Sequence, residues 1–430
     1  MKRGLPVLTL ILLIVCACSK KSVTDKSTPY DPSTPVTISR ISPDSGGATT
    51  QLMIYGSNFG DDTSQIKVYI NGHRAPLIAT TGSSLYVLVP SKSGSGDVKV
   101  LVGDPAQEVI APVGFTYFYY PRVGTLAGFT DKDGKTAIVD GPIDKAQFEE
   151  PYWLCLDEDK NIYLLEEYRG LRFINAARTE VSTKFRTGNG MGRPRTLAFN
   201  PTWDTLYITN DQDNWTGLST AVATKATNFT KWSSLIYSQQ TNGGDAQPQT
   251  GDYFFNAYST GAIFKWDRAA KVSKELFRIG DVSWEFNVQF APSGDFAYIV
   301  VVNQHYILKS TYNRSTGQLE TPVHFVGGRR SRGYKDGVGI DARLDHPMQG
   351  AFDENDNFYV CDAENHCIRK ITQEGVVSTF AGRPDDRGYT DGALRDAQFS
   401  LPRGIIYDQA SGTFYIADQV NRRIRSISTE

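Results

Sequence analysis

The chain of 430 residues has few of the side chains from which metal and catalytic sites are usually built. It contains five histidines, and none of them stands in an H-x-x-x-H or other paired metal-ligand spacing. A G-x-S-x-G nucleophile elbow and a Gly-rich phosphate loop are also missing. We therefore expect no metal site and no cofactor, and a function that needs no reactive group is favoured.

An excess of positive charge is lacking too. The chain has 45 lysines and arginines against 47 aspartates and glutamates, which gives a net charge of −2. A protein that binds the phosphates of nucleic acid needs a basic excess or a basic face, and the composition offers no such excess. Long apolar runs are equally scarce, since the one clear example is LPVLTLILLIV near the N-terminus.

Cysteine is rare and odd in number beyond the N-terminus, where Cys155, Cys361 and Cys367 remain. An odd number argues against a disulfide framework. Cys361 and Cys367 flank the segment DAENH, so they could bridge adjacent strands in an oxidising envelope. They could equally be buried as small apolar side chains, and the sequence leaves both interpretations open.

The N-terminal segment indicates export. Lys2 and Arg3 precede the apolar run, which is too short to span a bilayer as a folded helix, and small residues lead to Cys18. The segment VCAC resembles a lipobox, where the bacterial lipoprotein pathway cleaves before a cysteine and acylates it. The resemblance implies that residues 1–17 are a signal peptide and that Cys18 carries lipid. Residues 18–34 are polar and rich in Ser, Thr and Pro, which is typical of a flexible tether.

Short alternating strands are predicted for residues 35–119. Turn residues separate them roughly every 8 to 12 positions, which is the spacing of an antiparallel sandwich. The phrases ISPDSGG, MIYGSNFG, YINGHRAP and LYVLVPSKSGSGDVKVLV resemble the IPT/TIG family of immunoglobulin-like domains. That resemblance implies a spacer or docking module rather than a catalytic one.

Residues 120–430 contain a repeat. Six segments align on a polar turn between two apolar strands, with the leading positions Pro151, Pro194, Thr241, Glu285, Pro347 and Pro402. Their period of roughly 43 to 62 residues matches a four-stranded propeller blade. The phrases FYVCDAENHCIRKI and FYIADQVNRRIRSI resemble NHL repeats. The sequence thus predicts an all-β protein, in which a six-bladed NHL-like β-propeller follows the immunoglobulin-like IPT/TIG sandwich.

The repeat domain begins with the end of a unit. Its first phrase, RVGTLAG at residues 122–128, reads like GVVSTFAG at residues 375–382, which ends a blade. The last blade stops after its third strand, RRIRSIS, and lacks an outer strand. We therefore expect the first phrase to supply that strand, because pairing the two ends seals the ring and leaves no open sheet edge there.

The alignment also places three rings of side chains on one face of the propeller. We call it the leading face, because each inner strand begins there. The first two rings are Tyr152, Arg195, Asn242, Phe286, Met348 and Arg403, followed by Trp153, Thr196, Gly243, Asn287, Gln349 and Gly404. The third ring, at the ends of the second strands, is Glu166, Asn210, Asn256, Val301, Asp362 and Asp418.

This mixture of aromatic faces with planar donors and acceptors suits a sugar. The candidate ligand contacts are Tyr152, Trp153, Arg195, Trp215, Asn242, Phe286, Asn287, Gln349 and Arg403. Trp215 is included because it lies in a polar loop, where core packing does not explain it. In the alternative interpretation, Tyr152, Phe286 and Met348 plug the channel, and the Asp and Asn side chains cap turns by accepting backbone amides.

The order of the domains resembles that of lipoproteins from Gram-negative gut bacteria that accompany glycan-uptake systems. The resemblance implies a protein anchored in the outer membrane at Cys18. It favours the cell surface, but the periplasmic side stays open, because SKKS after Cys18 lacks the acidic run that usually accompanies surface export. It further implies that the propeller binds a glycan without cleaving it and works beside an outer-membrane transporter. Two alternatives stay open, a protein-docking scaffold and a polysaccharide lyase or hydrolase. The only candidate groups for catalysis are His305, His346, His366, Asp362 and Glu166.

Overall fold

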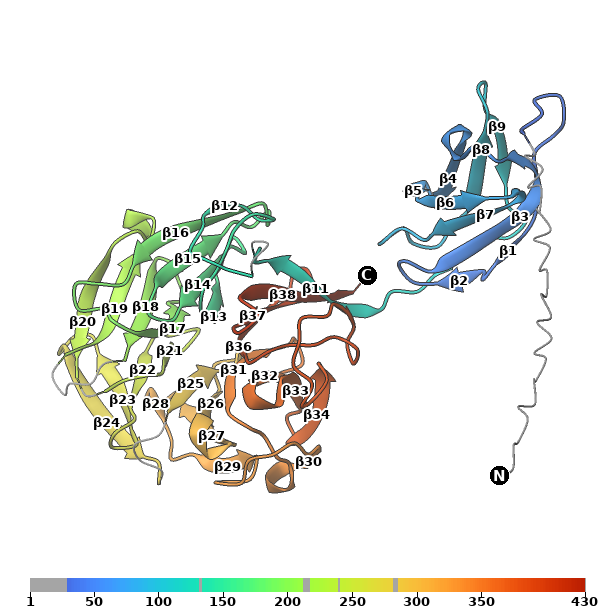
Figure 1. Cartoon of the computed structure of the whole chain (residues 1–430). Helices are drawn as coiled ribbons and strands as arrows, with labels where there is room; N and C mark the ends of the chain where they lie inside the picture. The colour runs from blue at the N-terminus through green and yellow to red at the C-terminus, as the bar shows by residue number, and fades with distance from the viewer. Residues whose placement is uncertain (1–28, 131–133, 212–216, 239, 281–284, 430) are drawn as a thin grey trace, which may run out of the picture. The chain divides into compact units, whose positions relative to one another are not determined.

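The computed structural model describes residues 29–429 except 131–133, 212–216, 239 and 281–284. These residues divide into two compact units between Tyr119 and Tyr120 (Figure 1). They form strands and short 3-10 turns, with no α-helix in the described ranges, and none of their segments is a helix long and apolar enough to cross a membrane. The predicted signal peptide and Cys18 lie outside the described residues. The 3-10 turns are η1 (Thr63–Gln65), η2 (Lys225–Thr227), η3 (Val302–Gln304), η4 (Gly339–Asp341) and η5 (Ala363–Asn365).

The first unit is a sandwich of two antiparallel sheets. One sheet has the order β1 (Thr37–Ser42), β3 (Gln51–Gly60), β7 (Gly82–Leu88) and β6 (Leu77–Thr80). The other has the order β5 (His73–Ala75), β4 (Ile66–Ile70), β8 (Val98–Val102) and β9 (Gln107–Ile110), and a short parallel pair joins β2 (Ser45–Gly46) to β10 (Thr116–Tyr117). Val98, Val100 and Val102 alternate with less buried residues and fill the core between the sheets, which confirms the predicted sandwich.

The second unit is a propeller of six sheets around a central axis (Figure 1). Each inner strand begins at, or within three residues of, its predicted leading position. We number the blades 1 to 6 by the inner strands β13 (Pro151–Leu156), β17 (Pro194–Phe199), β21 (Gly244–Ala246), β25 (Phe286–Phe290), β31 (Pro347–Phe352) and β36 (Pro402–Asp408). The second strands are β14 (Ile162–Glu166), β18 (Thr205–Asn210), β22 (Tyr253–Ala257), β26 (Phe296–Val301), β32 (Phe358–Asp362) and β37 (Thr413–Asp418).

The third and outer strands complete each blade. The third strands are β15 (Gly170–Ile174), β19 (Leu218–Thr224), β23 (Ala262–Asp267), β27 (Tyr306–Asn313), β33 (Cys367–Ile371) and β38 (Arg423–Thr429). The outer strands are β16 (Glu180–Arg186), β20 (Trp232–Tyr237), β24 (Val272–Arg278), β29 (Val323–Val326), β34 (Val376–Ala381) and β11 (Pro121–Ala127). Two-residue strands at the periphery are β12 (Gly141–Pro142), β28 (Gln318–Leu319), β30 (Gly337–Val338) and β35 (Gly392–Ala393).

Strand β11 closes the ring, as the repeated phrase predicts. It pairs antiparallel with β38, from Pro121 opposite Thr429 to Ala127 opposite Ile424. The glycine that ends the phrase has a physical role, because Gly128 has φ 109° and a Cβ there would lie 2.5 Å from the carbonyl oxygen of Arg422. Gly382, which ends the matching phrase, has φ 97°. The phrase recurs because every such strand end must approach the start of its own third strand closely.

Blades 1, 5 and 6 share a buried arginine on the third strand that holds two carboxylates. Arg369 donates to Asp362 at 2.9 Å and to Asp336 at 2.6 Å. Arg425 donates to Asp418 at 2.8 Å and to Asp391 at 2.5 Å, and Arg172 joins Glu166 and Asp140 in the same way. The second partner in each case begins a linker phrase that recurs before these blades, as DGPIDKAQF, DGVGIDARL and DGALRDAQF. The linker phrase is therefore a structural feature of these blades.

The cysteines of the propeller are free thiols. Cys361 and Cys367 are both fully buried, and the register places them opposite Ile368 and Asp362 rather than opposite each other. The interpretation of these residues as buried apolar side chains therefore holds in this structure.

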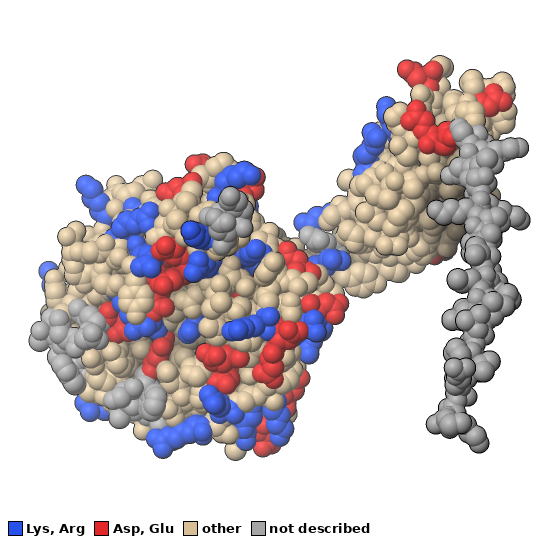
Figure 2. Space-filling model, in the orientation of Figure 1, with Lys and Arg blue, Asp and Glu red and all other residues tan. Residues whose placement is uncertain are grey.

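Charges of both signs are interspersed on the displayed surface of the propeller (Figure 2). No extended basic patch of the kind that nucleic acid requires is visible on that face.

Candidate functional site

Polar and charged side chains are bonded to one another across the channel at the leading face. The Tyr152 hydroxyl of blade 1 donates to Glu285 Oε1 of blade 4 at 2.9 Å. These blades stand opposite each other in a ring of six, so the hydrogen bond crosses the channel. Arg195 of blade 2 contacts the same carboxylate, and its guanidinium lies 4.7 Å from the centre of the Tyr152 ring. Both side chains are buried.

Glu167 is the central acceptor of this network. It accepts from Arg195 at 2.6 Å and from Arg193 at 2.8 Å. Burial alone would raise the pKa of Glu167, but the two guanidinium groups outweigh it and the pKa is lowered. Arg403 joins through Gln419, which accepts from Arg403 at 3.1 Å and donates to Glu167 at 3.4 Å. Of the two cations that the sequence offered as sugar contacts, Arg195 is thus paired with carboxylates of the protein, and Arg403 is linked to Glu167 through Gln419.

The other predicted contacts at the leading face are also engaged within the protein. Phe286 is fully buried, and Asn242 accepts from Asn256 at 2.7 Å. Asn287 accepts from Gln289 at 2.6 Å. Trp215 lies outside the described residues. The role of the leading-face residues as ligand contacts stays a prediction.

The third ring holds the loops that lead into the inner strands. Its carboxylates accept from the backbone amides of Glu149, Asp345 and Ser400, and Asn210 accepts from those of Gly192 and Arg193. Burial raises the pKa of Asp362 and of Asp418 to about 6, although each faces an arginine. This is the turn-capping arrangement of the alternative interpretation.

A cavity of about 380 Å³ opens at the opposite end of the channel, which we call the trailing face because the inner strands end there. Its walls are the second halves of the inner strands and the turns that follow them. Six aromatic rings line it, from Trp153, Phe199, Trp203, Phe290, Phe352 and Tyr407. Among the predicted contacts, Trp153 and Gln349 line this cavity, whereas Tyr152, Arg195, Asn242, Phe286, Asn287 and Arg403 do not.

Side-chain hydrogen bonds join the inner strands around the cavity, including those of blades 5 and 1, which are not adjacent. Gln349 of blade 5 accepts from the Leu154 amide of blade 1 at 3.0 Å and from the Ile405 amide of blade 6 at 3.2 Å. Gln289 accepts from the Gly350 amide at 2.8 Å. At the equivalent place blade 3 has a carboxylate, Asp245, which accepts from the Phe290 amide at 2.8 Å. Burial raises the pKa of Asp245 to about 7, so its carboxyl group is partly neutral at physiological pH.

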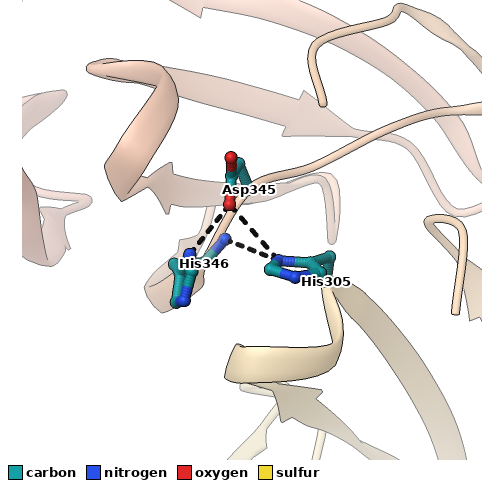
Figure 3. A group of neighbouring side chains, drawn as sticks. All are labelled: His305, Asp345 and His346. Carbon is teal, nitrogen blue, oxygen red and sulfur yellow. Dashed lines mark hydrogen bonds and ion pairs between the residues drawn. The ribbon is translucent and has the colours of Figure 1, made fainter. Parts of the chain in front are cut away.

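A third group of polar side chains lies at the junction of blades 4 and 5 (Figure 3). His346 Nδ1 lies 2.8 Å from Asp345 Oδ1, and His305 Nδ1 lies 3.4 Å from the same oxygen. The two imidazole rings are 4.8 Å apart. His366, by contrast, lies one junction further on, where its Nδ1 accepts from the Leu401 amide at 3.4 Å. Sequence reasoning named the two histidines but missed Asp345.

Comparison with known proteins supports the domain order. Residues 35–117 match the family model of the IPT/TIG domain. A solved auxiliary nutrient binding protein from Bacteroides thetaiotaomicron is 39% identical, with a TM-score of 0.78, and the match covers 94% of this chain and 99% of that one. The chain belongs to the family of this protein. An auxiliary nutrient binding protein from Bacteroides ovatus belongs to the same family, at 31% identity, a TM-score of 0.77 and coverage of 94% and 100%.

The family also includes a protein described as a putative phosphatase from Bacteroides thetaiotaomicron, which is 32% identical over 94% of this chain and 98% of its own, with a TM-score of 0.73. Among curated proteins, human NHL repeat-containing protein 2 is 32% identical over 115 residues. This chain covers 25% of its own length and 16% of the human protein in that match. The likeness confirms the NHL resemblance of the repeats.

The residues that line the cavity mouth carry a signal that the repeat alignment did not use. Pro201, Pro248 and Pro292 occupy nearly the same place, directly after the inner strands of blades 2, 3 and 4. The corresponding turns of blades 1 and 5 carry the acidic pairs DE of DEDKN and DENDN instead. Grouping three neighbouring prolines by blade would have indicated an apolar side of the trailing face.

Proposed function

We propose that the protein is a lipid-anchored accessory protein of a nutrient-uptake system, which binds a glycan in the trailing-face cavity and does not cleave it. Two relatives that share the whole domain order, at 39% and 31% identity, are described as auxiliary nutrient binding proteins. The predicted acylation at Cys18 would hold the chain on the outer membrane, at the cell surface beside a transporter. The binding role rests on the family and on the cavity, and the location rests on the sequence.

One observation carries the choice of ligand, which is that aromatic side chains form much of the cavity wall. Sugar rings present flat C–H faces to aromatic side chains and hydroxyl groups to planar polar ones. Trp203 and Tyr407 are partly exposed at the mouth, while Asp245 and Gln289 add polar surface to the wall. At about 380 Å³ the cavity lies toward the lower end of the usual range of about 300 to 1,000 Å³. It therefore suits a short oligosaccharide or the end of a longer chain.

The mouth of the cavity is chemically two-sided. The turns of blades 2 to 4 contribute Pro201, Pro248, Pro292 and the ring of Trp203. On the opposite side, the Tyr407 hydroxyl of blade 6 donates to Glu354 of blade 5 at 2.9 Å. A sugar has the matching asymmetry, with an apolar face and a hydrogen-bonding edge. An entirely apolar ligand would match only the proline side of this mouth.

The carboxylate count favours binding over hydrolysis. Glycoside hydrolysis ordinarily uses two carboxyl groups that flank the scissile bond. The lining of the cavity in the described part of the chain includes one, Asp245, and the Glu354 carboxylate beside the mouth accepts from the Tyr407 hydroxyl. The acids that the sequence offered for catalysis, Glu166 and Asp362, lie instead in buried salt bridges with Arg172 and Arg369. Neither lines the cavity.

Affinity gel electrophoresis with a panel of polysaccharides tests this proposal. A bound glycan should retard the protein, and Trp203→Ala should weaken binding by about tenfold or more, because it removes a stacking surface. Tyr237→Ala is the matched control, since it removes an aromatic ring that is 65% exposed on β20, away from the cavity. Arg403→Ala tests whether the leading face contributes to glycan binding.

Each outcome of this test has a distinct meaning. Loss of retardation with Trp203→Ala alone supports the trailing-face cavity. Loss with Arg403→Ala alone would return the site to the leading face. No retardation by any glycan, together with recovery of an outer-membrane transporter in a pull-down, would replace glycan binding with the docking role. New reducing or unsaturated ends in the glycan would overturn the non-catalytic assignment.

A further inference from the structure

The junctions between blades 4 and 5 and between blades 5 and 6 have the same backbone. The Asp345 amide donates to Asp362 Oδ1 at 2.6 Å, and the Ser400 amide donates to Asp418 Oδ1 at 2.7 Å. The next residues, His346 and Leu401, both have φ 52°. Each of their amides faces the Nδ1 atom of a histidine on the preceding blade. Serine and leucine are therefore compatible with this backbone conformation and its hydrogen bonds, so the fold alone does not require Asp345 and His346.

The side chains that differ bring three ligand groups together at the first junction. One atom each of His305, Asp345 and His346 can be chosen so that all three lie within 4.8 Å of one another. Two of the three separations are 2.8 and 3.4 Å. Ligands of tetrahedral zinc stand roughly 3.3 Å apart, as follows from metal–ligand bonds of about 2.0 to 2.1 Å. The group thus needs little movement to surround such an ion.

We propose that His305, Asp345 and His346 form a binding site for one Zn²⁺ ion, which joins blades 4 and 5 at the leading face. Two imidazole nitrogens and one carboxylate oxygen are a donor set that suits zinc. The Asp345 and His346 side chains are 15% and 27% exposed, so an ion can reach them from solvent. Three protein ligands leave a fourth position for water or for an oxygen of another molecule.

Zinc binds imidazole in its neutral form. Burial and the neighbouring His346 lower the pKa of His305, which favours that form. His305 Nδ1 accepts from the His346 amide at 3.2 Å, and a metal–nitrogen bond would replace this weak contact. The charge of Arg332 also lowers the pKa of His305 and opposes a bound cation, whereas the Asp345 carboxylate favours one.

The neighbouring junction supplies the matched variant for the test. The double variant Asp345→Ser with His346→Leu copies the residues of the blade 5 and 6 junction, so its backbone hydrogen bonds are retained. His366→Asn is the control, because it alters the equivalent histidine at the junction where serine and leucine replace the aspartate and the second histidine. The tag-free protein is stripped with a chelator, dialysed against micromolar Zn²⁺ and analysed for metal content, and affinity is measured by competition with a chromophoric chelator.

The expected result is one Zn²⁺ per chain in the wild type and in His366→Asn, with an unfolding temperature raised by a few degrees at saturating zinc. The double variant should bind at least about 100-fold more weakly, because it removes two of three ligands. Arg332→Gln should bind more tightly than the wild type. A wild-type chain without stoichiometric zinc, or a folded double variant with unchanged affinity, would overturn the site. If the double variant does not fold, the single variant His346→Leu decides by the same criterion.

Discussion

Arg425 offers the sharpest test of how the propeller is held together. Its guanidinium is fully buried and donates to Asp418 at 2.8 Å and to the carbonyl oxygen of Gln398 at 2.9 Å. Asp391, its other carboxylate partner, is 45% exposed and can return to water when the arginine is removed. Asp418 cannot, because its side chain is 0% exposed. Arg425→Met therefore leaves a buried carboxylate without a counter-charge.

The expected loss of unfolding free energy is about 3 to 5 kcal/mol at pH 7.5, the usual effect of breaking a buried ion pair. The loss should shrink at lower pH. Burial already raises the pKa of Asp418 to about 6 in the presence of Arg425, and without the arginine it must rise further. The variant then folds with Asp418 protonated, which costs about 1.4 kcal/mol for every pH unit above the unfolded pKa. After allowing for the smaller change in the wild type, we expect the loss to be about 2 kcal/mol less at pH 5.5.

The wild type itself should gain stability on acidification from pH 7.5 to 5.5. A carboxyl group whose pKa is raised on folding stabilises the protein fully only below its unfolded pKa, and this contribution is lost as the pH rises through the folded value. Asp362 and Asp418, with pKa values near 6, and Asp245, near 7, all act in this direction. Carboxyl groups with a lowered pKa, such as Glu167, oppose the trend only at more acidic pH. His305, whose pKa is also lowered, opposes it within this range, as a single group against three.

Urea titration followed by tryptophan fluorescence measures these effects in the propeller alone, because all six tryptophans lie between residues 153 and 284. The double variant Asp418→Asn with Arg425→Met is the control. Its unfolding free energy should recover part of the loss at pH 7.5 and should depend less on pH, because neither charge of this pair remains in the core. A loss below about 1 kcal/mol, or an equal loss at pH 5.5 and 7.5, would refute this account of the pair.

Three further predictions concern the closure of the ring and the thiols. Val123→Asp places a charge in the buried face of β11. It should lower the unfolding free energy of the propeller by about 3 kcal/mol or more, measured by the same titration. Gly128→Ala should cost about 1 to 3 kcal/mol, since alanine strains at φ 109° and its Cβ meets the Arg422 carbonyl; an unchanged midpoint would contradict the reported closure. Cys361 and Cys367 should react with iodoacetamide only after unfolding, because both are 0% exposed and burial raises their pKa; rapid labelling of the native protein would disprove this.

The architecture was predictable because repetition makes it visible in the sequence. The recurrence of the inner-strand phrases gave six blades, and the duplicated phrase that ends in Gly128 and Gly382 gave the closing strand. Both follow from local requirements that every blade meets separately, such as a glycine where two backbones approach within contact distance.

The contacts that distinguish the leading face from the trailing face could not be predicted from the repeats in the same way. An alignment of repeats brings equivalent positions together, whereas the bonds that close the leading face join positions that are not equivalent. Tyr152 is the residue after a leading position, but its partner Glu285 is itself a leading position three blades away. Arg195 and Glu167 likewise come from an inner strand and from the end of a second strand in different blades. Such pairs depend on the diameter of the ring, which sequence periodicity does not encode.

The departures from the repeat coincide with the two sites proposed above. Blades 1, 5 and 6 keep the buried arginine, the linker phrase and the strongest NHL likeness. The same arginine–carboxylate pairs stabilise all three blades. Blades 2 to 4 keep only the first two strands recognisably, and they supply Trp203, Asp245, Gln289 and the three mouth prolines. The same logic applies to Asp345 and His346, which differ from the serine and leucine of the next junction. Because the same backbone conformation accepts either pair of residues, the pair that brings three possible metal ligands together points to a role beyond folding.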